Sequence, residues 1–155
     1  MPGLERLPGW TLVDPLGVVD EVGADALRFA LLNGLTAGMD QRMSASRLEG
    51  ARNFANKIWN AARFALPLVE GHAPPAAPGL PEGQDLADRW ILSRLHSTLR
   101  DVETGMQNYE MNKGTKTIYD FFWHDYCDWY LEMIKSRLYG DEPADVKQAV
   151  IARAV

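Results

Sequence analysis

The longest regular pattern in the chain is a run of apolar residues at helical spacing between Ser44 and Val69. Apolar residues three and four apart lie on one side of an α-helix, because each residue turns the chain by about 100°. A helix of this length with one apolar side has to bury that side against other elements. The segment therefore favours a fold built from packed helices.

Helix-start and helix-stop residues divide the part of the chain before this segment. Asp14 followed by Pro15 predicts the start of a short helix that runs to about Val22. Gly23 is expected to interrupt it, and Asp25 to open a second helix.

The part after Val69 has further helical patterns, separated by residues that break helices. The proline-rich stretch HAPPAAPGLPEG, residues 72–83, is expected to be an exposed loop. Asp85 is expected to cap the next helix, whose pattern breaks at 105–108. A long helix follows over about 112–140, and Glu142 begins one more. With no strand pattern anywhere, the sequence predicts an all-α antiparallel helix bundle.

Length and composition place this bundle in a single domain of a reducing compartment. The chain has 155 residues and one cysteine, Cys127, which excludes an internal disulfide. No apolar run approaches the roughly 20 residues that a membrane-spanning helix needs. The first ten residues lack the pattern of a secretory signal. The expected location is the cytoplasm, with no membrane partner.

Positive charge is concentrated in one part of an acidic chain. The net charge is −5, yet residues 41–64 contain five basic residues and one acidic residue. The rest of the chain therefore carries −9. Such a distribution allows local phosphate binding, while the acidic remainder opposes indiscriminate binding of nucleic acid.

A helical wheel separates the side chains of residues 44–69 into two faces. The expected buried face holds Leu48, Ala51, Ala55, Ile58, Trp59, Ala62, Leu66 and Val69. The opposite face holds Asn53, Asn56, Lys57, Asn60, Arg63 and Phe64, with Arg52 at its edge. Phe64 is thus expected nearly opposite the core.

These residue types on one face favour binding of single-stranded RNA. Lysine and arginine neutralise phosphates, asparagine hydrogen-bonds a base edge, and an aromatic ring stacks on an unpaired base. The alternative is that Phe64 packs against the chain entering the proline-rich loop, while the asparagines are merely solvated. The pattern alone leaves both interpretations open.

Three segments resemble the valyl-tRNA synthetase family of class I aminoacyl-tRNA synthetases, in family order: GADALRFALLNGLTAGMD, RLEGARNFANKIWNAARF and YDFFWHDYCDWYLEMIKSRLYG. The likeness covers about residues 13–140. It implies the helical anticodon-binding domain that follows the catalytic domain in those enzymes. It also implies that the helix matching 44–69 reads the anticodon of valine tRNA through Lys57, Arg63 and Phe64, with Phe64 stacked on a base.

The chain also departs from that family. Where the enzymes carry the KMSKS loop that helps bind ATP, this sequence has GLERLPGW, without a lysine. Residues 1–13 are therefore expected to be a lead segment in place of the signature-loop region. Residues 14–155 are expected to be an anticodon-binding-like domain that is truncated at its C-terminus. Without the catalytic domain, the chain is expected to be inactive alone and to hold no cofactor, although the family enzymes use ATP.

Other groups of side chains have simpler interpretations. Asp125, Asp128 and Glu132 share a helix face near His124, but the Glu-x-x-His motifs of helix-bundle metal sites are absent, which favours a solvated acidic face. Cys127 has no basic neighbour along the sequence and is expected to be a buried structural thiol. An aromatic stripe is expected to pack in the core: Tyr119, Phe122, Tyr126, Trp129 and Met133.

Two functions from different classes follow. The first is a tRNA-binding module that recognises the anticodon loop of valine tRNA and contributes to aminoacylation in protein synthesis. The second is a helical interaction or scaffold domain that is derived from the same bundle and no longer binds RNA. An incomplete bundle exposes apolar surface, which predicts self-association.

Overall fold

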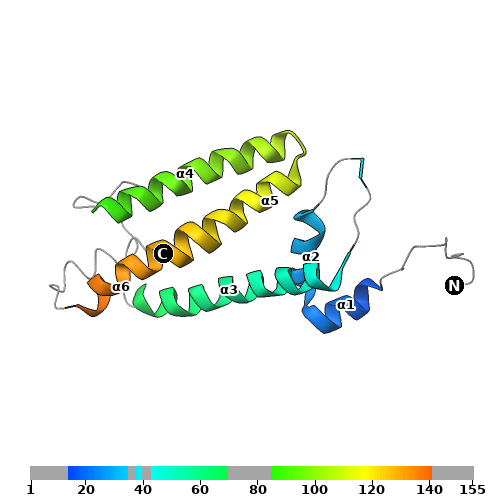
Figure 1. The fold of residues 1–155 in the computed structure, drawn as a ribbon, viewed down its shortest axis with the longest axis horizontal. Coiled ribbons are helices and arrows are strands. Elements are labelled where there is room, and N and C mark those ends of the chain that lie inside the picture. Colours follow the sequence, from blue (N-terminus) through cyan, green and yellow to red (C-terminus); the bar gives the residue numbers. More distant parts are fainter. Residues whose placement is uncertain (1–13, 35–37, 40–42, 70–84, 141–155) are drawn as a thin grey trace, which may run out of the picture.

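The computed structural model describes residues 14–34, 38–39, 43–69 and 85–140, and every regular element among them is helical (Figure 1). The elements are α1 (Pro15–Val22), α2 (Ala24–Leu32), α3 (Ala45–Val69), α4 (Leu86–Gln107), α5 (Met111–Asp120), the π-helical segment η1 (Phe121–Tyr130) and α6 (Leu131–Tyr139). The all-α prediction is confirmed. The proline-rich loop 72–83, the lead segment 1–13 and the helix expected from Glu142 lie outside the described residues.

Several residues expected to begin or end helices do so, but α2 begins at Ala24, after Gly23, and Asp25 lies within its first turn. The Asp14 carboxylate accepts hydrogen bonds from two backbone N–H groups in the first turn of α1. The Asp85 carboxylate accepts one such hydrogen bond at the start of α4, where its Oδ1 lies 2.9 Å from the backbone nitrogen of Asp88. Gly23 separates α1 from α2 with φ of 91°, a conformation that favours glycine. Helix α6 ends at Gly140.

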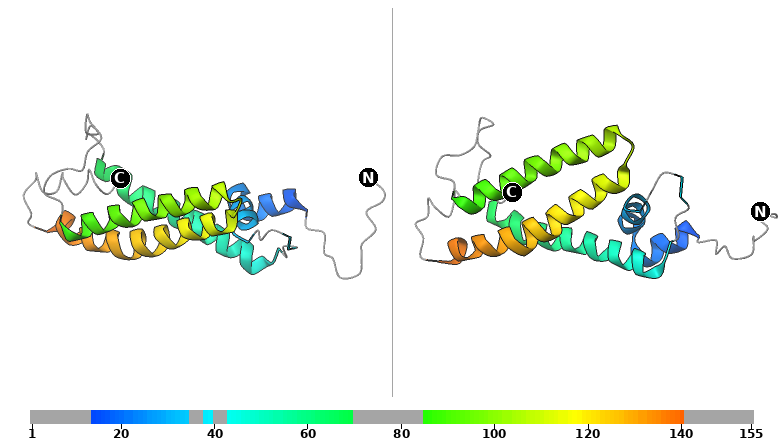
Figure 2. Two further views of the ribbon diagram at one scale, coloured as in Figure 1. Left: turned by 90° about the horizontal axis from the view of Figure 1, so that it is seen from above. Right: turned by 45° about the horizontal axis from the view of Figure 1, so that its top comes forward.

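Helices α5, η1 and α6 form one continuous rod, which pairs with α4 in antiparallel orientation (Figure 1). Helix α3 lies along the other side of the rod and runs in the same direction. Phe54 of α3 contacts Trp123, Lys57 contacts Asp128 and Phe64 lies near Lys135, so the contacts advance together along both elements. Helices α1 and α2 pack at the N-terminal end of α3, away from α6 (Figure 2).

The core has two parts that are joined by aromatic rings. The larger part contains the fully buried side chains of Tyr130 and Ile134, and the smaller part packs α2 against Ala51 of α3. Between the two parts lies a cluster of four rings with neighbouring centroids 4.7 to 6.4 Å apart: Phe29, Phe54, Tyr119 and Trp123. This cluster fixes the position of α3 against the rod.

Two glycines allow α4 and α5 to approach closely. A Cβ atom built on Gly105 would lie 3.4 Å from the backbone nitrogen of Gly114, which is itself buried. A larger residue at Gly105 would press on the α5 backbone. Glycine weakens a helix by about 1 kcal/mol relative to alanine. The close packing of α4 and α5 explains why glycine is present at these positions despite that cost. Helix α4 continues past Gly105 to Gln107, and the chain turns at Tyr109, where φ is 59°.

The aromatic stripe expected in the core is only partly buried. Tyr119, Phe122 and Tyr126 are half-buried, but the side chains of Trp129 and Met133 are 60% and 42% exposed. The prediction for these last two is wrong because η1 is π-helical. Its i→i+5 bonds give more residues per turn than an α-helix, so an α-helical period drifts out of phase along it. The buried positions become Cys127, Tyr130, Leu131, Ile134 and Leu138.

Candidate nucleic-acid interface

Helix α3 turns a different side toward the core than the helical wheel predicted. Its buried residues are Ala51, Phe54, Ala61 and Ala65. Three residues assigned to the buried face are instead exposed: Ile58, Trp59 and Leu66. Helix α3 has two apolar surfaces: one packs against neighbouring elements and the other is open. The helical wheel predicted a single buried face whose direction lies between these two surfaces.

Phe64 does not point away from the core. The side chain is half-buried and packs against the larger core cluster, so the expected placement opposite the core is wrong. On the wheel, Phe64 lies only about 80° from the mean direction of Ala61 and Ala65, and its long side chain reaches the rod. The Nζ atom of Lys135 lies 6.0 Å from the ring centroid. The unburied part of the ring remains at the surface between α3 and α6.

Lys57 lies on the same edge of α3, about two turns before Phe64. Its Nζ atom lies 2.9 Å from Oδ1 of Asp128 and 4.7 Å from the ring centroid of Trp123. The hydrogen bond from Lys57 holds the pKa of the Asp128 carboxyl below its usual value, and His124 adds to this effect. Lys57 is thus already paired with an acidic side chain of η1.

The other expected RNA-binding residues lie together on the solvent side of α3. We call this set the polar face: Arg52, Asn53, Asn56, Asn60 and Arg63, all of which are exposed. Among the described residues, neither Arg52 nor Arg63 forms an ion pair. The structure thus brings five of the seven expected residues together, and Lys57 and Phe64 border them on the side toward the rod.

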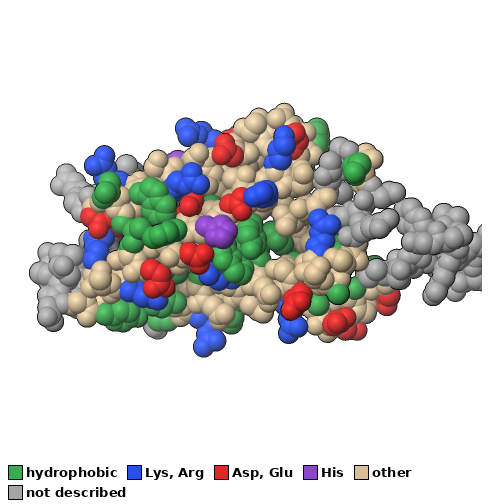
Figure 3. All heavy atoms as spheres, in the orientation of Figure 1, with side chains coloured by type: hydrophobic (Ala, Val, Ile, Leu, Met, Phe, Trp, Pro, Cys, Tyr) green, Lys and Arg blue, Asp and Glu red, His purple; other side chains and the backbone are tan. Residues whose placement is uncertain are grey.

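Acidic side chains of the rod form ion pairs with basic side chains nearby. Asp125 pairs with Arg94 of α4 at 2.7 Å, and Glu132 pairs with Lys135 at 2.6 Å. Lys, Arg, Asp and Glu side chains alternate over the face seen in Figure 3. Within the described part of the chain, no three His, Cys, Asp or Glu side chains gather as metal ligands would.

Cys127 is buried, as the sequence indicated. Burial raises the pKa of its thiol, and Asp128 adds to the rise, although Lys57 partly opposes it. Lys57 is a basic neighbour that the sequence alone did not reveal, because it comes from α3. A raised pKa leaves little reactive thiolate at neutral pH, which supports a structural role.

A buried polar cluster at the start of α4 was not found from the sequence. Asp88 is fully buried, and its Oδ1 accepts hydrogen bonds from the Tyr130 hydroxyl at 3.1 Å and from Arg137 at 3.3 Å. Arg137 also pairs with Asp85 at 2.7 Å. Burial, with Asp88 adding, raises the pKa of Tyr130. Residues so far apart along the chain give no local signal, and the cluster ties α4 to the rod.

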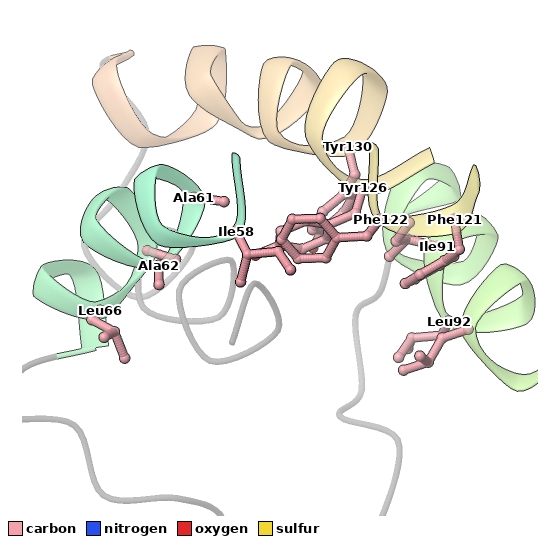
Figure 4. A pocket seen from close by; sticks show the side chains of 12 residues that line it. Ile58, Ala61, Ala62, Leu66, Ile91, Leu92, Phe121, Phe122, Tyr126 and Tyr130 are labelled. Atoms are coloured by element: carbon pink, nitrogen blue, oxygen red, sulfur yellow. The ribbon is translucent and has the colours of Figure 1, made fainter. Parts of the chain in front are cut away.

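An apolar groove lies on the open side of α3 (Figure 4). It has a volume of about 340 Å³ and runs between α3, α4 and η1. Ile58, Ala62 and Leu66 line it from α3, and Phe122 and Tyr126 from η1. These α3 residues are part of the face that the sequence assigned to the core. Desolvation raises the pKa of Tyr126 to about 12, with Cys127 adding, so its hydroxyl stays neutral.

The chain is similar to a known domain family and to individual proteins. Residues 88–155 match the family model described as the anticodon-binding domain of tRNA ligase. The chain is also 47% identical over 131 residues to the valine–tRNA ligase of Carboxydothermus hydrogenoformans, a match that covers 84% of this chain and 15% of that protein.

Valine–tRNA ligases of other bacteria show the same relation. The match to the Symbiobacterium thermophilum protein has 47% identity over 137 residues, or 88% of this chain and 15% of the relative. The match to the Geobacillus stearothermophilus protein has 46% identity over 135 residues, or 87% and 15%. The chain thus spans about 15% of the length of these relatives. None of the helices in the described ranges is both long enough and apolar enough to cross a membrane.

Proposed function

The chain is a relative of a segment of the valine–tRNA ligases, with residues 88–155 belonging to their anticodon-binding domain family, and we propose that it binds the anticodon loop of valine tRNA. The observation that carries the proposal is the polar face of α3, where three asparagines and two arginines lie exposed side by side. A match covering 84% of the chain has to include α3, because that helix lies in the middle of the sequence.

Each group on and beside the polar face has a separate role in the proposed interface. Arg52 and Arg63 neutralise phosphates of the loop. The amides of Asn53, Asn56 and Asn60 donate to and accept from base edges, which an unpaired loop leaves accessible. These contacts determine where the loop sits along α3.

Two residues at the border of the polar face complete the interface. The surface part of the Phe64 ring packs against one unpaired base, while its buried part anchors the ring in the core. Lys57 exchanges Asp128 for a phosphate when RNA binds. The exchange lowers the gain from that phosphate contact, because the ion pair with Asp128 is lost.

The net charge of −5 limits binding to RNA that fits the polar face. The chain outside residues 41–64 repels phosphates, which disfavours binding elsewhere on the surface. We assign the module to residues 14–155, with 1–13 as a lead segment, and place its work in the cytoplasm as part of tRNA aminoacylation. This module positions tRNA and has no catalytic step of its own.

A salt-titrated binding measurement tests the proposal. The chain is titrated with valine tRNA and, in parallel, with a tRNA for another amino acid. We expect tighter binding of valine tRNA at every salt concentration, and affinity for both that falls as salt rises. Equal affinity for the two tRNAs, or no binding to either, would contradict it.

The apolar groove supports a second function, in which the chain associates through this surface with another copy. Ile58 and Leu66 are 42% and 57% exposed on the α3 side of the groove, where an apolar partner would cover them. Sedimentation velocity at rising concentration is expected to show a dimer in the parent. Leu66→Glu is expected to remain monomeric at all concentrations. A parent that stays monomeric over the whole range would rule this function out.

A further inference from the structure

The Asp128 carboxylate has a different neighbour at each of its two oxygens. Oδ1 accepts a hydrogen bond from Nζ of Lys57, on α3, at 2.9 Å. Oδ2 lies 3.3 Å from Nδ1 of His124, which precedes Asp128 by four residues in η1. We call Lys57, Asp128 and His124 the charge cluster. A lysine side chain is cationic at neutral pH, whereas a histidine gains its charge between about pH 8 and about pH 5.

The charge cluster is open to solvent. The exposed fractions of its side chains are 30% for Lys57, 41% for Asp128 and 58% for His124. Protons therefore reach the imidazole, and an anion from solution can reach the ammonium group. A change of charge at His124 is thus felt at a cation that borders the polar face.

Other titratable groups close to His124 are paired or buried. The charged ones form separate ion pairs: Asp120 with Lys116 on α5, and Asp125 of η1 with Arg94 of α4. The Tyr119 ring meets the imidazole edge-on, with ring centroids 6.3 Å apart. Cys127 is buried, and burial raises the pKa of its thiol. Within the described part of the chain, Asp128 is the acid that pairs with His124.

Protonation of His124 weakens the hold of Asp128 on Lys57. An imidazolium beside Oδ2 draws on the same negative charge and repels the ammonium group beside Oδ1. The hydrogen bond from Lys57 chiefly lowers the pKa of Asp128, and His124 adds to this effect, so both neighbours act on one carboxylate. Removing Lys57 from Asp128 therefore costs less free energy when His124 is charged.

Trp123 keeps the ammonium group of Lys57 at the edge of the polar face. Nζ lies 4.7 Å from the centroid of the ring, and the attraction between a cation and an aromatic face does not require Asp128. An ammonium group that leaves Asp128 therefore remains beside the RNA proposed to bind along α3.

We propose that His124 couples RNA binding to pH, by controlling whether Lys57 is held by Asp128 or binds a phosphate. The inference rests on the proposed function and adds regulation to it. When His124 is neutral, Asp128 retains Lys57, and the interface binds RNA with one cation fewer. When His124 is charged, it pairs with Asp128, and Lys57 binds a phosphate. Affinity for RNA therefore rises as the pH falls.

The pH dependence of RNA binding tests the proposal. The affinity of the parent for the anticodon stem-loop of valine tRNA is measured from about pH 8 to about pH 5.5, at constant ionic strength. We expect it to rise about two- to fivefold, the range that an exposed ion pair contributes. His124→Gln should lose most of this rise. His96→Gln, on the exposed side of α4, removes a histidine outside the charge cluster and should keep it.

Two further variants test whether the effect passes through Lys57. Asp128→Asn releases Lys57 at every pH, so it should bind more tightly than the parent at about pH 8 and rise little further. Asp101→Asn, at an exposed position of α4, controls for the change of net charge. Lys57→Ala should lose the pH dependence, because His124 then has no cation to release. Circular dichroism at each pH verifies that every variant is folded.

The outcomes separate the role of His124 from the proposed function. If the parent binds the stem-loop with one affinity over the whole pH range, the role of His124 is wrong and the α3 interface stands. A full rise in His124→Gln would also overturn the proposal, because another group would then take up the protons. A full rise in Lys57→Ala would overturn it as well, because the charge would then act on the RNA directly. If the parent binds no RNA at any pH, both proposals fail.

Discussion

The Nζ atom of Lys57 lies 2.9 Å from Oδ1 of Asp128, which joins α3 to η1 at the edge of the polar face. The same Nζ atom lies 4.7 Å from the Trp123 ring, so a single ammonium group contacts an acid and an aromatic ring from one element. Lys57 therefore contributes both to the packing of the bundle and to the charge of the proposed interface.

This ion pair makes stability depend on acidity in a defined direction. The pKa of Asp128 is lowered in the folded chain from its ordinary value of 3.8, chiefly by the hydrogen bond from Lys57. A carboxyl group whose pKa is lower in the folded chain than in the unfolded chain stabilises the fold at pH values above its unfolded pKa. This stabilisation is lost as the pH falls through its pKa in the folded chain. Asp128→Asn should therefore unfold more easily than the parent near neutral pH.

The stability gap of Asp128→Asn should close below pH 3.8, where the parent loses the same contribution. Urea unfolding over a series of pH values measures this gap. Asp101→Asn, an exposed variant on α4, controls for the change of net charge. A gap that stays constant through the acidic range would show that Asp128 acts through packing and not through its charge.

Phe64→Leu should affect both stability and RNA binding. The ring is half-buried against the core, so we expect a loss of about 1 kcal/mol in the free energy of unfolding. Loss of the flat ring should also weaken stem-loop binding by roughly 1 to 3 kcal/mol, the value of one stacked base. Circular dichroism melts and fluorescence anisotropy measure the two effects.

Phe54→Leu is the matched control for this variant. Phe54 is 3% exposed within the aromatic cluster, so its loss should lower stability without changing the affinity of the folded chain. If Phe64→Leu lowered stability but left the RNA affinity unchanged, as Phe54→Leu is expected to do, Phe64 would contribute only to the core.

Tyr130→Phe removes one hydrogen bond from the fully buried Asp88. Leaving a buried carboxylate with fewer donors costs about 1 to 3 kcal/mol, even though Arg137 remains nearby. Denaturant unfolding should show a loss of this size. Tyr139→Phe, at a position that is 71% exposed, should show no loss. Equal stability of the two variants would mean that the Tyr130 hydroxyl does not stabilise Asp88.

The sequence predicted helix boundaries well because the signals for them are local. The side chains of Asp14 and Asp85 accept backbone hydrogen bonds from the first turn of the helix that follows, and Gly140 ends α6. Such contacts depend on residues within a few positions of each other, which a single sequence displays. The five exposed residues of the polar face were predicted for the same reason, since they share one side of one helix.

Which sides of α3 and of the rod face the core could not be predicted in the same way. Ile58 and Leu66 line an open groove between α3, α4 and η1, and only the position of α4 in the fold reveals that groove. The π-helical segment η1 shifts Trp129 and Met133 outward, and nothing in the sequence marks where its period changes. Partners such as Tyr130 and Asp88, 42 positions apart, depend on the fold itself.

We propose that the polar face of α3 binds the anticodon loop through its charge, and a comparison of two arginine variants tests this claim. Arg63→Ser removes a charge from the polar face, and Arg100→Ser removes an equal charge from an exposed site on α4. Stem-loop affinity is measured for both variants and the parent over a range of salt concentrations. For Arg63→Ser we predict weaker binding and a salt slope reduced by about 0.7, the value for one lost phosphate contact. Arg100→Ser should keep the parent's slope. Identical slopes for the two variants would contradict the claim.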